Sequence, residues 1–332
     1  MLIVLGTFLI GLTLLDALWT TVAPRGGGPV TKRLARGMWS AGLAIHRRSG
    51  GGAHGLLAVL GPLLLATALL GWVVGLWFGW AVIFSSDGAS VVTSITREPA
   101  SFVERIYFTG FVLFTLGTGD YVPVGGGWQV LSNVASLSGL VVVTLSVTYV
   151  LSVVTAVVAK RRLAGSIHSL GRSPEELVTR MWDGSGLSGL EQYLPALSSA
   201  IELHTQRHLA YPVLHYFHSA DQRIALEPAL AVLDDALLLL MEGLAPDVRP
   251  APAIVLPARN TIESFLGTLR ESFIREAPRA APPPDLTALE NAGIPTVSSE
   301  SFVAAAAGAS QRRKLLLGLV QDSGWGRHTW SG

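Results

Sequence analysis

The decisive stretch of this 332-residue chain is Ser101-Phe-Val-Glu-Arg-Ile-Tyr-Phe-Thr-Gly-Phe-Val-Leu-Phe-Thr-Leu-Gly-Thr-Gly-Asp120, which lies between two long apolar runs. Ser101 and Glu104 form a helix-start signature, because the serine oxygen and the glutamate side chain can satisfy free backbone N–H groups reciprocally. The helix is too short to cross a bilayer, so we expect it to dip in and return. It leads into alternating glycines, Gly117 and Gly119, which let successive carbonyls point the same way. Non-helical backbone at membrane depth is tolerated only where protein buries it or water lines it, and an ion path meets that condition.

Three apolar runs predict membrane-spanning helices. Residues 55–84 and 121–159 contain no charge, and both exceed the ~20 residues that a span needs. Leu2–Val22 is a third run, broken only by Asp16. It lacks the basic start and the small-residue cleavage site of a signal peptide, so we expect a retained membrane helix. Asp16 is either a functional acid or a structural one that reaches the interface or hydrogen-bonds a serine or threonine, and we favour the structural role.

The composition excludes several function classes. Charged residues make up 14% and hydrophobic residues 50% of the chain, which argues against a wholly soluble protein. The net charge of +1 argues against a nucleic-acid partner. With no cysteine, the chain has no disulfide, thiolate metal site or thiol nucleophile. No nucleophile–base pairing stands out, so we expect no enzyme.

Basic clusters predict the topology. Residues 23–54 carry six Lys or Arg and no acid, so they should stay cytoplasmic and leave the N-terminus outside. The last span then returns to Lys160-Arg161-Arg162 inside. We expect the membrane to be a bacterial plasma membrane. Val30, Leu34 and Met38 predict a helix along the membrane face. The basic residues of this region pair with Asp16, bind anionic lipid headgroups or only set the topology; they are Arg25, Lys32, Arg33 and Arg36. Tryptophans near the outer ends lie at the interface or pack between helices; these are Trp72, Trp77, Trp80 and Trp128.

In this context, Thr115-Leu-Gly-Thr-Gly-Asp120 resembles the filter of the potassium channel family, which has the form Thr-x-Gly-x-Gly-Asp. The resemblance covers residues 56–160 as outer helix, pore helix, filter and inner helix. It implies that filter carbonyls and the Thr115 hydroxyl replace the hydration shell of K+, the permeant ion, with no cofactor. The chain has one filter match and no repeat, so the resemblance implies a homotetramer. The predicted ion-binding residues are Thr115, Leu116, Gly117, Thr118 and Gly119. The alternative is a strained structural loop in a membrane bundle.

Two positions depart from the common family filter. Thr118 stands where an aromatic side chain usually packs behind the carbonyls, and Leu116 stands where valine is frequent. A smaller side chain leaves the filter wall less braced, so a non-selective monovalent cation channel is the alternative. Asp120 should support the filter or lie at the outer mouth, although a capping role in the loop is the simpler alternative.

The predicted inner helix, residues 128–159, offers a hinge and a gate. Gly139 lies where channels of this family often place a hinge. Steps of three or four residues from Gly139 give one apolar stripe, which either narrows the pore and gates by dewetting or faces lipid and neighbouring helices. The stripe consists of Val143, Val147 and Leu151, with Val150 as the alternative last member.

The second half predicts a mostly helical cytoplasmic domain. Helix-like stretches cover residues 175–182, 187–210, 226–241, 260–276 and 301–320, separated by proline-rich breaks at 246–257 and 278–284. Gly184–Gly189 fits a dinucleotide fingerprint, but it does not follow a strand. Four histidines are candidate metal ligands or proton sensors, with core packing as the default; they are His204, His208, His215 and His218.

The sequence therefore predicts an all-α membrane protein with a tetrameric, potassium-channel-like pore. We expect an N-terminal membrane helix (1–24), a basic interfacial loop (25–54), a pore domain (55–160) and a helical cytoplasmic domain (161–332). The expected function is K+ conduction, gated by an unknown stimulus on the cytoplasmic domain. Besides the non-selective channel, the alternative is a membrane-anchored metal-dependent sensor or hydrolase whose pore does not conduct.

Overall fold

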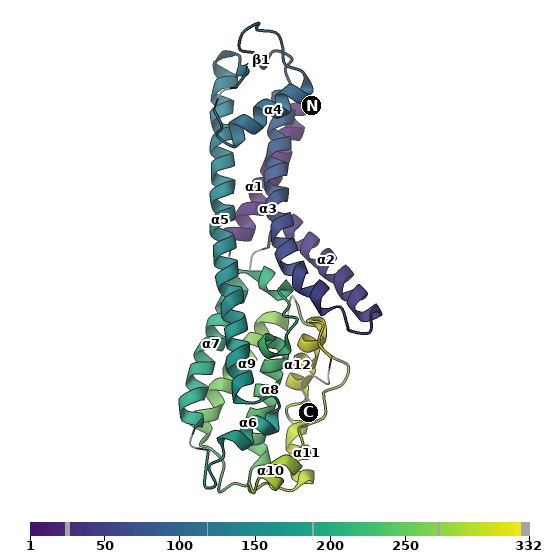
Figure 1. The fold of residues 1–332 in the computed structure, drawn as a ribbon, viewed down its shortest axis with the longest axis vertical. Coiled ribbons are helices and arrows are strands. Elements are labelled where there is room, and N and C mark those ends of the chain that lie inside the picture. The colour runs from purple at the N-terminus through teal and green to yellow at the C-terminus, as the bar shows by residue number, and fades with distance from the viewer. Residues whose placement is uncertain (24–26, 118, 188, 271–272, 327–332) are drawn as a thin grey trace. The chain divides into compact units, whose positions relative to one another are not determined.

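The computed structural model describes residues 1–23, 27–117, 119–187, 189–270 and 273–326 (Figure 1). The protein is 72% helical with 3% strand, which confirms the all-α fold class. Contacts divide it into two compact units. The N-terminal unit contains Met1–Arg36 and Leu63–Val153, and the C-terminal unit contains Gly37–Pro62 and Val154–Gly332.

In the described part of the chain, three helices are long and apolar enough to cross a membrane, as predicted: α1 (Leu2–Val22), α3 (His54–Phe84) and α5 (Gly125–Leu170). Helix α5 extends further than the expected 128–159. Its basic residues near 160 continue the helix because Lys and Arg are good helix formers. The helix ends before Gly171, and Ser173 then caps the next helix by accepting a hydrogen bond from Glu176 N.

Helix α1 packs closely on α3 in the N-terminal unit (Figure 1). A Cβ on Gly6 would lie 2.7 Å from Gly79 O, and one on Gly79 would lie 2.7 Å from Ile10 Cγ1. Glycines let helix backbones approach where lipid supplies no hydrophobic drive for association. The extra N-terminal helix is therefore a packed part of this unit.

The short helix α4 (Phe102–Leu113) begins where the sequence predicted. Ser101 is its N-cap, and both hydrogen bonds of the capping box with Glu104 are present. Two short strands, β1 (Val91–Thr93) and β2 (Tyr121–Pro123), pair antiparallel and were not predicted. Three residues are too short for an alternating pattern to show.

Helix α2 (Pro29–Arg48) explains the buried acid of α1. The Asp16 carboxylate accepts hydrogen bonds from Val30 N at 2.7 Å and from the Thr31 hydroxyl at 2.5 Å. Trp72 Nε1 donates a third at 2.9 Å. Asp16 thus caps the first turn of α2, where free N–H groups favour a negative charge. This is the structural role that the sequence favoured.

The four tryptophans all hydrogen-bond protein groups. Trp72 and Trp80 are 3% and 4% exposed, and Trp80 Nε1 donates to the Ser138 hydroxyl. Trp77 donates to Ile106 O, and Trp128 to the Asp87 carboxylate. Packing between helices therefore accounts for Trp72 and Trp80 better than an interfacial position does.

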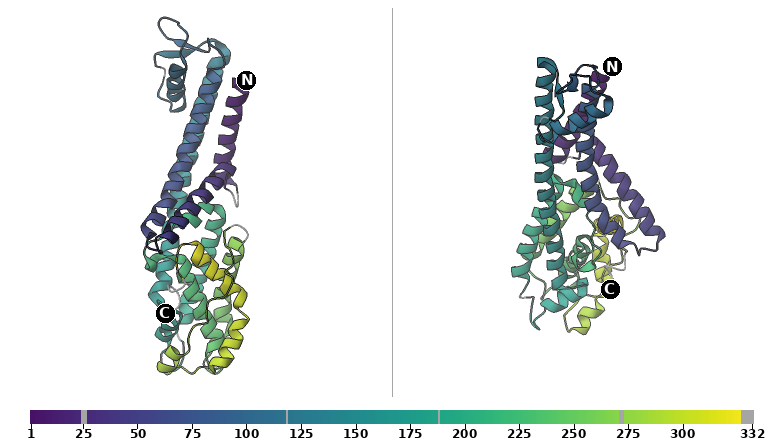
Figure 2. Two further views of the ribbon diagram at one scale, coloured as in Figure 1. Left: turned by 90° about the vertical axis from the view of Figure 1, so that its right-hand side faces the viewer. Right: turned by 45° about the horizontal axis from the view of Figure 1, so that its top comes forward.

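The C-terminal unit is a helical assembly, seen from two further sides in Figure 2. Its described residues form one isolated β-bridge, Leu244 with Thr296, and no longer strand. Three expectations differ from the structure: α9 begins inside the first proline-rich break, α10 was not predicted, and the last expected helix is divided at Gly308. Pro252 opens α9 because proline is favoured at a first helical position. The elements are α6 (Pro174–Met181), α7 (Leu190–Ala210), η1 (Pro212–Tyr216), η2 (Gln222–Ile224), α8 (Leu226–Leu238), a π-helical turn (Leu239–Gly243), α9 (Pro252–Arg270), α10 (Thr287–Asn291), α11 (Ser299–Ala307) and α12 (Ser310–Asp322).

Buried ion pairs accompany the apolar core of this unit. Lys160 of α5 lies 2.7 Å from the Glu227 carboxylate, and its ammonium also donates to Phe217 O. Arg312 pairs with Asp234 at 2.7 Å, and Arg313 pairs with Asp235. The fingerprint-like glycines near 184 follow α6 and precede α7, so the strand that a dinucleotide site needs does not precede them.

Candidate functional site: the glycine segment after α4

The glycine segment, residues 115–120, leaves the C-terminal end of α4 with two left-handed backbone angles. Thr115 has φ of +55° and Gly117 has φ of +95°. Glycine adopts such angles freely, but a β-branched threonine there is a genuine outlier that costs about 1–3 kcal/mol. Left-handed backbone conformations therefore flank Leu116 on both sides. Such an alternation of backbone conformation lets successive carbonyls point the same way. Thr118 lies outside the described residues.

The segment is anchored at its start and exposed beyond it. Leu116 N donates to Phe111 O at 3.0 Å, which fixes the chain just after α4. The Leu116 side chain is 66% exposed in the single chain. The last α4 carbonyls carry partial negative charge, which favours a cation near this end. The backbone at Thr115 and Leu116 is therefore fixed to the end of α4, in a place that favours a cation.

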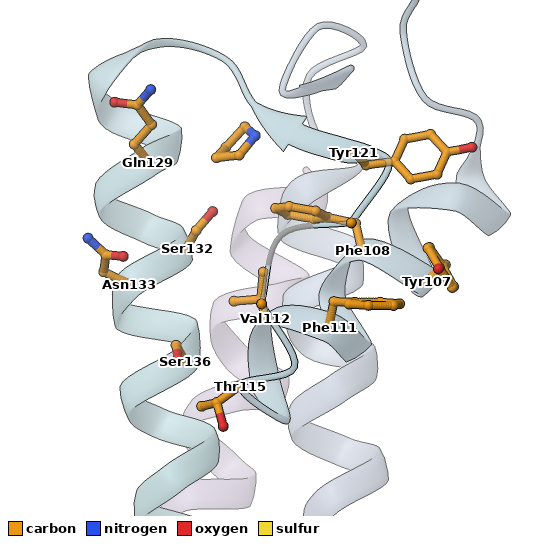
Figure 3. A pocket seen from close by; sticks show the side chains of 13 residues that line it. Tyr107, Phe108, Phe111, Val112, Thr115, Tyr121, Gln129, Ser132, Asn133 and Ser136 are labelled. Carbon is orange, nitrogen blue, oxygen red and sulfur yellow. The ribbon is translucent and has the colours of Figure 1, made fainter. Parts of the chain in front are cut away.

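A cavity of about 460 Å³ adjoins the segment (Figure 3). Phe108 and Phe111 of α4 lie on one side of it, and Asn133 and Ser136 of α5 lie on the other. Thr115 lies at its lower end in this view. Amide and hydroxyl side chains on a membrane helix are costly unless they meet protein or water. This polar surface of α5 is consistent with a wet path or a protein partner.

Gly139 gives α5 its close approach to α4. A Cβ at this position would lie 2.3 Å from Leu113 O, closer than real Cβ contacts come. Helix α5 is continuous through Gly139. The glycine thus has a packing role against Leu113, two residues before the glycine segment, and its proposed role as a hinge stays a prediction.

The C-terminal end of the segment is held by β1 and by α4. Ser94 N donates to Asp120 O at 2.7 Å, and β2 follows at Tyr121. The Tyr121 hydroxyl donates to Glu104 Oε1 at 2.7 Å. This hydrogen bond raises the pKa of Tyr121 to about 12 and lowers the pKa of Glu104. Support by the Asp120 side chain stays a prediction, because the hydrogen bond from Ser94 uses the backbone carbonyl.

Comparison with known proteins agrees with this geometry. A family model described as an ion channel matches residues 70–156, which include α4 and the glycine segment. This chain belongs to the two-transmembrane, potassium-channel-like family of ion channels. The channel is also 38% identical over 320 residues to the uncharacterized membrane protein YdjJ of Bacillus subtilis (strain 168), across 96% of the channel and 93% of that protein. No solved structure matches the channel.

The apolar stripe of the channel lies on one exposed face of α5. Val143, Val147 and Leu151 are 42%, 55% and 64% exposed in the single chain. Helical periodicity places Val147 on the same face as Ser136 of the cavity, 11 residues earlier and so about three turns away. The residues predicted as a gate thus continue the face that begins beside the glycine segment. Their action as a gate stays a prediction.

The four candidate histidines of the channel do not lie in one cluster. His204 and His208 have ring centroids 5.9 Å apart, and His208 and His215 6.1 Å apart. His218 instead lies 3.0 Å from His54, between ring nitrogens. Burial lowers the pKa of His204 to about 3 and that of His215 to about 4, so both are neutral near pH 7. Among the described residues, no group of three or more His, Asp or Glu is placed to hold a metal ion.

Sequence reasoning missed two features of this site. The pair of Glu104 and Tyr121 joins residues 17 positions apart, and no local pattern indicates it. The Glu104 signature was identified, but only as a cap. Arg105 was also missed; it is 9% exposed and donates to Gly88 O at 2.6 Å, holding α4 to the segment before β1.

Proposed function

We propose that the protein is a homotetrameric channel that conducts K+ passively, with the glycine segment as its filter. The observation that carries this proposal is the pair of left-handed angles at Thr115 and Gly117, directly after a capped short helix between two spans. Strained backbone persists where the surrounding structure enforces it, and it clusters at ligand-binding sites. Four strands of carbonyls around an axis would replace the water shell of K+.

The exposed surfaces of the N-terminal unit support assembly from several copies. One chain supplies one strand of carbonyls, whereas a cation needs ligands on all sides. The polar stretch at Asn133 and the apolar stretch at Val147, which follow one another along α5, are both open in the single chain. Neighbouring copies and a central water path would cover them.

We further propose that the C-terminal unit receives the gating stimulus and that basic residues of α2 meet anionic lipid. Helix α5 contributes residues to both units, so a change in one can reach the other along a continuous helix. Lys32 and Arg33 are exposed on α2, and each basic group near a membrane surface contributes on the order of 1 kcal/mol. Arg36 shares this helix, and Arg25 lies outside the described residues.

Ion flux into liposomes tests the proposal. Purified protein is reconstituted, and uptake is measured with K+ or Na+ as the only permeant cation, beside protein-free liposomes. K+ uptake well above Na+ uptake supports the proposal. Equal uptake replaces it with the non-selective channel that Thr118 suggests, and uptake at the protein-free level contradicts conduction of either ion. Vesicles with and without anionic lipid test the role of Lys32 and Arg33, whose loss should remove any lipid dependence.

A further inference from the structure

The Glu104 carboxylate links the start of α4 to the residue that follows the glycine segment. Glu104 Oε2 accepts a hydrogen bond from Ser101 N at 2.6 Å, which caps α4. Glu104 Oε1 accepts one from the Tyr121 hydroxyl at 2.7 Å. Tyr121 directly follows the glycine segment. The start of α4 and the outer end of the segment are therefore tied through a single side chain.

The backbone of Tyr121 is fixed independently of this tie. Tyr121 pairs with Thr93 in the β1–β2 ladder, and the neighbouring Asp120 carbonyl accepts from Ser94. The strand pairing sets the position of the Tyr121 backbone, and the hydrogen bond to Glu104 sets the direction of its side chain. The hydroxyl thus constrains the segment in a way that strand pairing alone does not.

Aromatic contacts carry this constraint to the side of the segment. The rings of Tyr121 and Tyr107 have centroids 6.0 Å apart, and those of Tyr107 and Phe111 4.5 Å apart. The edge of Phe111 lies 3.6 Å from the position that a Cβ on Gly119 would take. Figure 3 shows Tyr121 and Tyr107 on the same side of the cavity, with Phe111 below them. A row of rings thus runs from the Glu104 carboxylate to Gly119.

We infer that Tyr121, held by Glu104, is a positioning residue that keeps the outer end of the filter rigid enough to select K+. This inference rests on the proposed function. Residue 118 is a threonine, too small to brace the segment as a ring can. Hydrogen bonds to an ionised group are roughly twice as strong as neutral ones, so the tie is suited to that task. Selectivity depends on the number and field strength of carbonyl ligands, which a loosened outer end would change.

The substitution Tyr121→Phe removes the hydroxyl and keeps the ring. In full-length protein reconstituted in liposomes, we expect the ratio of K+ to Na+ uptake to fall by roughly tenfold, the size of effect that loss of a hydrogen bond to a charged group produces. Total cation uptake should persist. Glu104→Gln keeps an acceptor oxygen without the charge and should give a smaller fall. The double variant should match Tyr121→Phe alone, because without the hydroxyl the charge at residue 104 has no hydrogen bond to Tyr121 left to strengthen.

Tyr193→Phe is the matched control, since it removes the hydroxyl of an exposed tyrosine in α7, away from α4 in the chain. Its selectivity should equal that of the unchanged protein. Thermal unfolding of each variant separates lost selectivity from lost folding. A selective unchanged protein whose Tyr121→Phe and Glu104→Gln variants are equally selective overturns the role of the tie alone. An unchanged protein that does not prefer K+ removes the proposed function, and this role with it.

Discussion

The two compact units differ in how far their polar and apolar groups are buried or paired within one chain. In the C-terminal unit, buried charges such as Lys160 and Asp234 have partners within the same chain. In the N-terminal unit, Leu116 and Val147 are more than half exposed, and the polar side chains of Gln129 and Asn133 on α5 are exposed where they line the cavity beside the glycine segment. One unit completes its core within one chain. The other presents surfaces that further copies, lipid or water must cover.

The largest expected effect is a loss of ion uptake caused by a substitution in the N-terminal unit. Gly117→Ala places a side chain at φ of +95°, a conformation that residues other than glycine resist. We expect K+ uptake into liposomes to fall to the level of protein-free vesicles, while the protein still folds. Gly165→Ala makes the same chemical change in open space on α5 and should leave uptake intact. Normal uptake by the Gly117→Ala variant would remove the backbone argument for the filter.

Loss of a buried ion pair should lower the free energy of unfolding of the C-terminal unit. Lys160→Met leaves the Glu227 carboxylate buried without its ammonium partner, which typically costs about 3–5 kcal/mol. Denaturant unfolding of the purified protein, followed by a probe in the C-terminal unit, measures this loss. The double variant Lys160→Met with Glu227→Leu should recover most of it, because no charge is then stranded. If the single variant is as stable as the unchanged protein, this unit does not depend on its internal pairs.

Gly139→Ala tests the contact between α5 and the end of α4. The added methyl would meet Leu113 O, so α4 and α5 must separate, at a cost of about 1–3 kcal/mol. We expect reduced thermal stability together with reduced K+ uptake. Gly127→Ala, on the same helix with open space around it, is the control and should change neither. A fully active and stable Gly139→Ala variant would refute the packing role.

Acid should weaken the C-terminal unit through its buried histidines. Burial keeps the pKa of His204 near 3 and that of His215 near 4, below the usual value of about 6.5 in an unfolded chain. Between those values the unfolded state binds more protons, so stability is present above about pH 6.5 and is lost as the pH falls. The loss is about 1 kcal/mol per histidine and pH unit. Melting temperatures from pH 7 to 5 measure it, and His215→Gln should flatten the slope; a pH-independent melt would contradict neutral burial.

The smallest effect concerns the apolar face of α5. Val147→Asp places a charge on a surface that is 55% exposed in the single chain. If this face narrows the water path, the charge should hydrate it and raise K+ uptake severalfold. Val158→Asp, also exposed on α5 but in the C-terminal unit, is the comparison. Equal uptake by the Val147→Asp variant and the unchanged protein would place the gate elsewhere.

The membrane helices and the start of α4 could be predicted from the sequence because their signals are local. An uncharged run long enough to cross a bilayer and a Ser-x-x-Glu cap each predict a structure from one continuous stretch of sequence. The role of Asp16 was predicted only in outline, since its partners at Thr31 and Trp72 depend on how α1, α2 and α3 meet.

The remaining features depend on pairings across the fold. The end of α5 was placed too early because hydropathy marks where a helix leaves the apolar region, not where its hydrogen bonds stop. The tie between Glu104 and Tyr121 and the separation of His218 from His204 both follow from contacts between distant segments. Residue types alone could not distinguish these arrangements.

A density map of the purified protein in K+ tests the central claim most directly. We expect four chains around one axis, with residues 115–119 lining it and a row of ion densities between their carbonyls. A monomer, or an assembly in which this segment faces away from the axis and holds no ions, would contradict it.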